Sequence, residues 1–195
     1  RHMKKLFLTL AVAFASLAAN AQLYVGGEVG AWRNSDDNKT DFNLKPEIGY
    51  QLNDKWDLGI GIGFSHKYRG AEDGEYNVKT NSFYVDPYAR WSFVKFGPVR
   101  MFLDITAGVG TSKRKHTVTV LGEEKTISDD ADVAWRVGVQ PGVAVSLCKN
   151  LDFIAHVGFI GYTDADKESV SPYGDKGFGF DLSSNNLNFG FVYKF

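Results

Sequence analysis

The carboxy-terminal segment of the chain alternates strictly between large apolar side chains and small or polar ones. The large apolar residues are Leu187, Phe189, Phe191, Tyr193 and Phe195, and the residues between them are Asn188, Gly190, Val192 and Lys194. A two-residue period puts each of these two sets on its own face of a β-strand. A face with so many aromatic side chains needs a cover, and a lipid bilayer covers the outer face of a transmembrane β-barrel. The alternative is a buried strand of a soluble sandwich.

The same period recurs along the rest of the chain, which favours the barrel over the sandwich. The predicted strands span residues 23–32, 41–52, 56–65, 82–93, 99–109, 133–147, 151–159 and 187–195. Short turns at 53–55, 94–98 and 148–150 alternate with long polar connections at 33–40, 66–81, 112–131 and 163–185. Outer-membrane barrels have short periplasmic turns and long external loops. We therefore predict an all-β fold, an eight-stranded antiparallel up-and-down transmembrane β-barrel with periplasmic termini.

The amino-terminal segment has the features of a cleavable secretory signal peptide. Lys4 and Lys5 form a basic start, residues 6–17 are apolar, and Ala19-Asn20-Ala21 matches a small-x-small cleavage site. We predict a signal peptide at residues 3–21 and a single barrel domain at residues 22–195. Residues 1–2 precede a natural-looking Met3 and resemble a cloning remnant.

Two segments of the chain, residues 46–52 and 188–195, resemble the small eight-stranded barrels typified by outer membrane proteins A and X. This resemblance implies a location in the outer membrane of a Gram-negative bacterium. The alternating aromatics that end in Phe195 also resemble the signal that the barrel-assembly machinery recognises, carried here by Phe189, Phe191, Tyr193 and Phe195. Proteins of that group are structural proteins, adhesins, defence proteins or occasionally lipid-modifying enzymes, so the fold does not give the activity.

Composition and charge exclude several other classes of protein. The net charge of −1 and the lack of a basic stripe argue against nucleic-acid binding. Cys148 is the single cysteine, so no intramolecular disulfide forms. The acidic runs at 129–132 and 164–166 are typical of solvated loops, and we expect neither a metal nor a cofactor.

The inward faces of the predicted strands carry charges of both signs. An eight-stranded barrel is just wide enough for side chains to fill it, and unpaired buried charge is costly. We therefore expect the arginines to pair with the carboxylates rather than to line an ion path. The predicted interior network consists of Glu28, Glu47, Asp86, Arg90, Arg100, Asp104 and Arg136. Lys45, Asp57, Asp152 and Lys194 also face inward by parity.

A catalytic set of nucleophile, base and orienting residue is not visible in the pattern. His156 is inward with apolar or glycine neighbours on its face, and His66 and His116 lie at the bases of loops. Ser65 adjoins His66 but faces the opposite side of the strand. A lipid A-modifying enzyme is therefore disfavoured.

The third long connection has the alternation of a β-hairpin rather than of an irregular loop. Residues 113–120 and 125–128 favour strands, and 121–124 favour a turn. We predict a ribbon that stands above the membrane, with a solvated loop as the alternative. The ribbon's base contains Lys113, Arg114 and Lys115, which suit the phosphates of lipopolysaccharide.

Pro46, Pro87 and Pro141 occupy equivalent positions, each six residues before the last outward residue of its strand. Proline removes a ladder hydrogen bond, so these positions are either kinks or seams that open toward lipid. From these features we expect a non-enzymatic, monomeric surface protein with a structural or adhesive role through its external loops. Its partners would be outer-membrane lipid, lipopolysaccharide, the assembly machinery and a host or cell-surface ligand. The alternative is lateral transport of a small hydrophobic ligand, and a small ion pore is less favoured.

Overall fold

The computed structural model describes residues 22–35, 38–70, 77–120, 123–129, 131–165, 171–173, 176–181 and 187–195. The predicted signal peptide lies outside these residues. The strands are β1 (Gln22–Asn34), β2 (Lys39–Gln51), β3 (Trp56–Arg69), β4 (Asn77–Phe96), β5 (Val99–Val120), β6 (Glu123–Ser128), β7 (Asp132–Cys148), β8 (Leu151–Val157), β9 (Phe159–Ala165), β10 (Gly177–Asp181) and β11 (Leu187–Lys194). Within the described residues, no helix is both long and apolar enough to cross a membrane.

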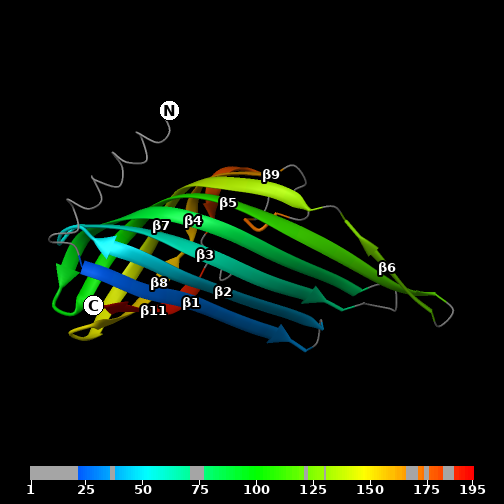
Figure 1. The fold of residues 1–195 in the computed structure, drawn as a ribbon, viewed down its shortest axis with the longest axis horizontal. Helices are drawn as coiled ribbons and strands as arrows, with labels where there is room; N and C mark the ends of the chain where they lie inside the picture. Colours follow the sequence, from blue (N-terminus) through cyan, green and yellow to red (C-terminus); the bar gives the residue numbers. More distant parts are fainter. Residues whose placement is uncertain are drawn as a thin grey trace, which may run out of the picture.

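The strands form one closed antiparallel wall (Figure 1). β1 pairs with β2 on one side and with β11 on the other, which joins the first strand to the last. β8 and β9 follow one another along the seventh crossing of the barrel, and β10 and β11 along the eighth. The predicted all-β, eight-stranded antiparallel barrel is thus confirmed.

Both ends of the barrel domain lie at the same rim. The Gln22 side chain donates a hydrogen bond of 2.6 Å to the carbonyl oxygen of Phe195, and the Phe195 N–H donates one of 3.0 Å to Leu23. The turns at 53–55, 97–98 and 149–150 lie at this rim too, as Figure 1 shows. That this rim is periplasmic stays a prediction.

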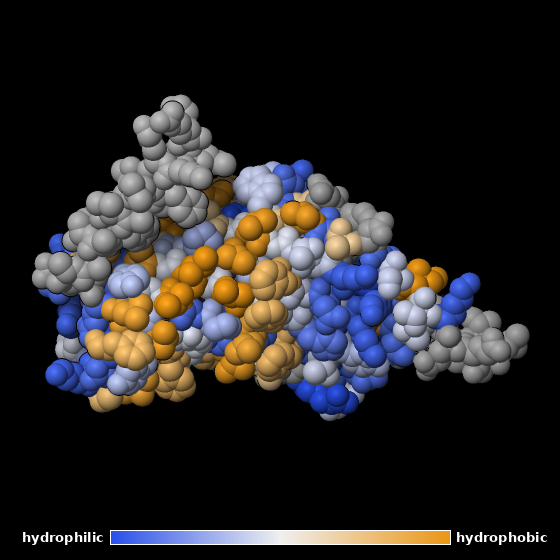
Figure 2. All heavy atoms as spheres, viewed as in Figure 1, coloured by the Kyte–Doolittle hydropathy of each residue, from blue (hydrophilic) through white to orange (hydrophobic). Residues whose placement is uncertain are grey.

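The outer surface of the wall is apolar where a bilayer would contact it. In β2, Phe42, Leu44, Ile48 and Tyr50 are all more than 40 % exposed, whereas Glu47 between them is buried. Figure 2 shows hydrophobic side chains gathered over the part of the barrel nearer the carboxy terminus, and hydrophilic ones over the part toward β6. This alternation is what a lipid-covered wall with a side-chain-filled interior requires.

The seventh crossing departs from strict alternation at Gly158. This glycine has φ of 75°, lies between β8 and β9, and shifts the two-residue period by one position. The alternation of Phe153, Ala155 and Val157 predicts that Phe159 faces lipid. Phe159 is instead buried inside the barrel, and Ile160 faces outward. The prediction for Phe159 was wrong because the extra residue reverses the face of everything after it.

Each of the three prolines interrupts the wall on one side only. Pro46, Pro87 and Pro141 stay paired with the preceding strand, opposite Gly27, Ile60 and Leu103. Toward the following strand, each proline and the residue before it are absent from the ladder, which is paired again on both sides of the gap. The ladder is thus interrupted over two residues at each proline and is paired above and below the gap.

The third long connection forms the predicted hairpin. β5 has 22 residues, and its last six pair with β6 from Lys115 opposite Ser128 to Val120 opposite Glu123. The pairing of β5 with β7 ends at Ser112, and its pairing with β4 ends at Thr117. The tip of the hairpin therefore extends past both neighbouring strands, and Figure 1 shows it projecting from the barrel. The predicted hairpin is confirmed, and its position above the membrane stays a prediction.

Candidate functional site

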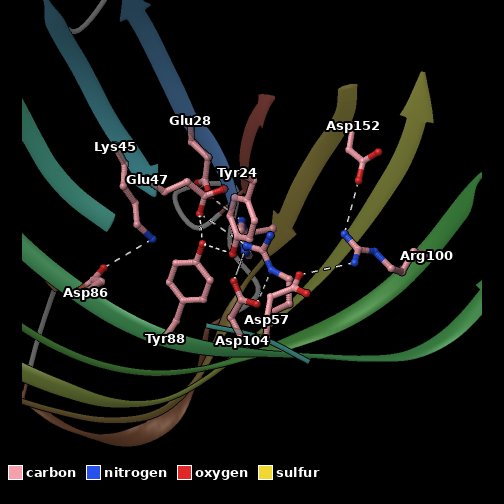
Figure 3. A network of polar contacts seen from close by, with 12 residues as sticks. Tyr24, Glu28, Lys45, Glu47, Asp57, Asp86, Tyr88, Arg100, Asp104 and Asp152 are labelled. Atoms are coloured by element: carbon pink, nitrogen blue, oxygen red, sulfur yellow. Dashed lines mark hydrogen bonds and ion pairs between the residues drawn. The ribbon is translucent and has the colours of Figure 1, made fainter. Parts of the chain in front are cut away.

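The interior of the barrel holds a chain of ion pairs in three groups along its length. Figure 3 shows Lys45 and Asp86 at one side, Glu47, Tyr88 and Asp104 in the middle, and Arg100 with Asp152 at the other side. Strand parity brings these side chains inward, because even positions on β4 and β5 and odd positions on β2 face the lumen. Each group has its own central charged residue.

The central group is organised around Arg90 on β4. Its guanidinium donates two hydrogen bonds, of 2.8 and 2.9 Å, to the two carboxylate oxygens of Asp104 on β5, and lies 3.6 Å from Glu47. Tyr88 donates a hydrogen bond of 2.7 Å to Glu47, and its hydroxyl is 2.9 Å from that of Tyr24. The fork of an arginine matches a carboxylate in this geometry, which makes the pair both strong and directional.

His156 on β8 joins this group to the amino-terminal strand. Its Nε2 lies 2.8 Å from Asp104, and its Nδ1 lies 2.7 Å from Glu28 on β1. The contact with Asp104 has hydrogen-bond geometry, whereas Nδ1 lies at ion-pair distance from Glu28 without a hydrogen bond. The imidazole thus lies between two buried carboxylates. The ring edge also contacts Phe102, at a centroid distance of 5.2 Å.

The group nearer the loops centres on Asp86 of β4. Arg136 of β7 donates a hydrogen bond of 2.6 Å to Asp86, and Lys45 of β2 lies 3.6 Å from the same carboxylate oxygen. The carboxylate is fully buried. Because unpaired buried charge is expensive, the two cations offset the cost of burying the Asp86 carboxylate.

A short loop segment reaches into the barrel and completes this group. The Tyr173 hydroxyl donates a hydrogen bond of 2.9 Å to the second oxygen of Asp86. Its ring packs edge-on to Tyr84 at 5.6 Å and lies 4.6 Å from the Arg136 guanidinium. Burial, reinforced by the Asp86 charge, raises the pKa of Tyr173, so the phenol keeps its proton and donates. Residues 172 and 173 thus lie over the lumenal side of β4 and β5, against Asp86 and Gly110.

The third group lies nearer the short turns. Arg100 of β5 stands between Asp57 of β3, at 3.6 Å, and Asp152 of β8, at 3.5 Å. Asp152 also accepts a hydrogen bond from Ser146, at 2.9 Å, and contacts the Lys194 ammonium at 2.6 Å. An apolar cluster fills the barrel beside it, made of Tyr24, Phe102, Ala144, Ile154 and Val192.

The structure brings most of the predicted network residues together, with different partners in places. Arg90 contacts Asp104 and Glu47, and Arg136 contacts Asp86. Arg100 lies beside Asp57 and Asp152 rather than beside any of the four predicted carboxylates. The bridging positions of His156 and Tyr173 were not predicted. The inward parity of His156 among so many carboxylates was the available signal, whereas nothing in the loop pattern marked Tyr173.

The proposed lipopolysaccharide contact is divided between the two faces of β5. Lys113 and Lys115 face outward and are exposed, whereas Arg114 faces the lumen and its Nε is buried without a hydrogen-bond partner. The four residues of the proposed assembly signal all face outward, with exposed fractions of 46 % to 63 %. Phe189 and Phe191 pack against Phe153 of β8, at centroid distances of 6.0 and 5.5 Å.

Histidines and acids do not converge on an external catalytic or metal site in the described part of the chain. His66 Nδ1 contacts the Asn81 side chain at 2.6 Å, and His116 Nε2 contacts Asp129 at 3.2 Å. No cluster of three or more His, Cys, Asp or Glu residues is placed to hold a metal ion among the residues described.

These features define an outer-membrane β-barrel with a polar, paired interior. The chain matches the outer membrane protein beta-barrel domain over residues 6–195 and belongs to that family. It is a protein of the Gram-negative outer membrane. A comparison with curated proteins finds no match.

Three solved structures illustrate the likeness. A major outer membrane protein from Thermus thermophilus is 13% identical with a TM-score of 0.56, covering 90% of this chain and 100% of that one. Neisserial surface protein A is 18% identical with a TM-score of 0.42, over 90% and 96%. Ail, the attachment invasion locus protein of Yersinia pestis, is 18% identical with a TM-score of 0.41, over 90% and 97%. At these identities the likeness concerns the fold alone.

Proposed function

We propose that the protein is a non-enzymatic surface protein that binds an extracellular partner through its external loops, with the β5–β6 hairpin as the main contact element. The observation that carries this proposal is the length of β5. Its tip continues past the last pair with β4, at Thr117, and far past the last pair with β7, at Ser112. A hairpin that covers no part of the barrel contributes little to its closure and is available for contact with another molecule.

The outer edge of the hairpin supports the same function. Among the described residues β6 pairs with β5 alone, so its second edge presents free backbone groups. Residues 125–128 are exposed, including Ile127 at 53 %. An extended peptide can add to such an edge through main-chain hydrogen bonds, with side-chain contacts giving specificity.

The filled interior favours this function over the alternatives. The ion pairs around Asp86, Arg90 and Arg100 occupy the lumen at three levels. The wall is paired above and below each proline, which gives less support to lateral passage of a hydrophobic ligand. In a small ion pore the paired charges would have to separate. Separating buried ion pairs costs a large free energy, because each charge would lose its partner in a poorly hydrated interior.

Further parts of the proposal concern assembly and oligomeric state. The outward aromatic row Phe189, Phe191, Tyr193 and Phe195 would be read by the barrel-assembly machinery before the strand closes against β1. The barrel would act as a monomer, because β1 and β11 complete the wall within one chain. We propose no nucleic-acid partner and no cofactor.

The binding role can be tested by shortening the hairpin. Residues 117–126 are replaced with Asn-Gly, which closes a two-residue hairpin turn. Cells that display the parent protein or the shortened variant are compared for binding to immobilised glycosaminoglycans, extracellular-matrix proteins and cultured epithelial cells. We expect the parent to bind and the variant to lose binding while its barrel still shows heat-modifiable migration.

A matched control shortens a different connection, the one predicted at residues 66–81. Replacing residues 71–76 with Asn-Gly leaves the β5–β6 hairpin intact and should leave binding unchanged. A hairpin-shortened variant that binds as well as the parent, or a parent that binds nothing in the panel, would contradict the proposal.

A further inference from the structure

Two glycines of β5 leave room for a connecting segment on the lumenal face of the wall. Gly108 and Gly110 are lumenal residues of β5 and are paired with β7 on one side. A Cβ on Gly108 would lie only 2.6 Å from the hydroxyl oxygen of Tyr173, and a Cβ on Gly110 would lie 3.0 Å from Cγ of Pro172. Larger residues at these two positions would therefore push the segment away from β5. The missing side chains are what admit Pro172 and Tyr173.

The residues around the Tyr173 ring supply every contact that a phenol group can use. The hydroxyl donates a hydrogen bond of 2.9 Å to Oδ1 of Asp86. The ring packs edge-on to Tyr84 at 5.6 Å, and the Arg136 guanidinium lies over the ring, 4.6 Å from its centroid. Both arrangements are favourable for an aromatic ring. We call these residues, Tyr84, Asp86, Gly108 and Arg136, the Tyr173 subsite.

The Asp86 carboxylate divides its two oxygens between the interior network and this hydroxyl. Its Oδ2 accepts a hydrogen bond of 2.6 Å from Arg136 and lies 3.6 Å from the Lys45 ammonium, a contact that Figure 3 shows. Its Oδ1 accepts the Tyr173 hydroxyl. Because Asp86 is fully buried, an occupant without a donor would leave Oδ1 unpaired, at a cost in free energy. The subsite therefore selects for a hydroxyl as well as for a ring.

The present occupant belongs to a connecting segment and not to the wall. β9 ends at Ala165 and β10 begins at Gly177, so Tyr173 lies between two strands. Its N–H donates a hydrogen bond of 3.1 Å to the side chain of Ser171, within the same segment. Tyr173 can thus leave the subsite without breaking a strand ladder. A free molecule that carries the same chemical groups can compete with it.

We propose that the Tyr173 subsite binds a small molecule that carries a phenol group, in competition with Tyr173 itself. The hydroxyl of the ligand would donate to Asp86, its ring would lie against Arg136 and Tyr84, and the segment around Tyr173 would be released. Asp86 belongs to the group of ion pairs nearer the loops, so the ligand would enter from that side. Competition lowers the apparent affinity in proportion to the fraction of molecules whose subsite is free. The subsite lies inside the barrel and does not depend on the hairpin's partner.

The first test compares two probes on the purified full-length protein in detergent micelles by ligand-observed NMR, with empty micelles as the background. The probes are p-cresol, which reproduces the tyrosine side chain, and 4-methylanisole, which lacks the hydroxyl hydrogen. We expect p-cresol to bind Tyr173→Ala at least about 10-fold more tightly than the wild type. In that variant 4-methylanisole should bind at least about 10-fold more weakly than p-cresol. Tyr162→Ala removes an outward tyrosine that packs on Trp135 and should keep the wild-type affinity for p-cresol.

The second test measures displacement in the wild type and needs no substitution in the subsite. Lys176 follows the segment, is 49% exposed and pairs with Asp164 at 2.8 Å, so trypsin can report on the release of Tyr173. We expect p-cresol to speed cleavage after Lys176 several-fold and 4-methylanisole to leave it unchanged. Equal affinity for the two probes, or the same p-cresol affinity in the wild type and Tyr173→Ala, would overturn the subsite. A cleavage rate that p-cresol does not change would overturn the competition.

Discussion

Tyr173, on a loop segment, donates a hydrogen bond of 2.9 Å to Asp86, which lies on a strand inside the barrel. The contact joins residues that are 87 positions apart and fixes the loop over the lumen. Asp86 receives Arg136 on one oxygen and Tyr173 on the other. A loop that would otherwise extend into solvent is thereby part of the interior network.

Removing only this hydroxyl should destabilise the barrel measurably. We expect Tyr173→Phe to lower the free energy of unfolding by about 1.5–3 kcal/mol, because a hydrogen bond to a buried charged group is lost and its acceptor stays buried. The measurement is urea unfolding of the protein in detergent micelles or liposomes. Tyr162 faces outward against Trp135, so Tyr162→Phe is the control and should have little effect. Equal stability of the two variants would show that the Tyr173 hydrogen bond contributes little to the free energy of unfolding.

Arg90 and Arg100 should differ in their tolerance of lysine. Arg90 makes a two-point contact with Asp104, at 2.8 and 2.9 Å, whereas Arg100 makes single contacts of 3.5 and 3.6 Å with its two carboxylates. A lysine cannot reproduce the fork of a guanidinium. We expect Arg90→Lys to cost roughly 2–4 kcal/mol and Arg100→Lys about 1 kcal/mol or less. The same unfolding assay ranks them, and the reverse order would refute the geometric argument.

Alanine substitution should have very different effects on stability at two glycines, because only one of them lies where two strands approach closely. A Cβ on Gly138 would collide with the Ile160 carbonyl oxygen and lie 2.7 Å from the Phe159 ring, whereas a Cβ on Gly179 would meet nothing within 4 Å. Gly138→Ala should therefore destabilise the barrel by roughly 1–3 kcal/mol, because backbone must move. Gly179→Ala should be nearly neutral. The refolding yield and the urea midpoint are measured for both variants. A Gly138→Ala barrel as stable as the parent would mean that β7 and β9 separate easily.

The alternation of the strands was predictable because lipid and lumen impose opposite demands on successive residues. Phe42, Leu44 and Ile48 could be assigned to the outside from sequence alone for this reason. The position of Phe159 could not, because an apolar side chain suits either face and a single extra residue at Gly158 leaves no trace in composition.

The partners of the interior charged residues were harder to predict from sequence than the direction of their side chains. Parity says that Arg100 faces inward, but its partners depend on how far each strand is staggered along the barrel. The stagger places Arg100 beside Asp57 and Asp152 rather than beside Asp86 or Glu47. The lumenal direction of Arg114 followed from the same parity that placed Arg100 and Asp104 inside, so that signal was present in the sequence.

The barrel should become less stable when the cation closest to a buried carboxylate is removed. Arg136→Ala would leave Asp86 with Lys45 at 3.6 Å and with Tyr173, so the remaining charge compensation is weaker. It would also remove the guanidinium that lies 5.0 Å from the Phe159 ring. Breaking one side of a buried ion pair typically costs about 3–5 kcal/mol. We expect a clearly lower denaturant midpoint in detergent, with binding through the external loops unchanged.

The paired interior charges lead us to expect low conductance in planar bilayers. If Lys45, Arg136 and Tyr173 hold Asp86 as the structure places them, the wild-type barrel should pass almost no current, because its interior charges are paired and its loop side is covered by Tyr173. Lys45→Met, Asp86→Leu and Arg136→Met together remove all three charges of this group and should recover much of the stability lost in Arg136→Ala. Large, steady currents from the wild type, together with an Arg136→Ala barrel as stable as its parent, would mean that water fills the interior and screens these charges. A porin-like role would then explain the polar lumen better than a packed core does.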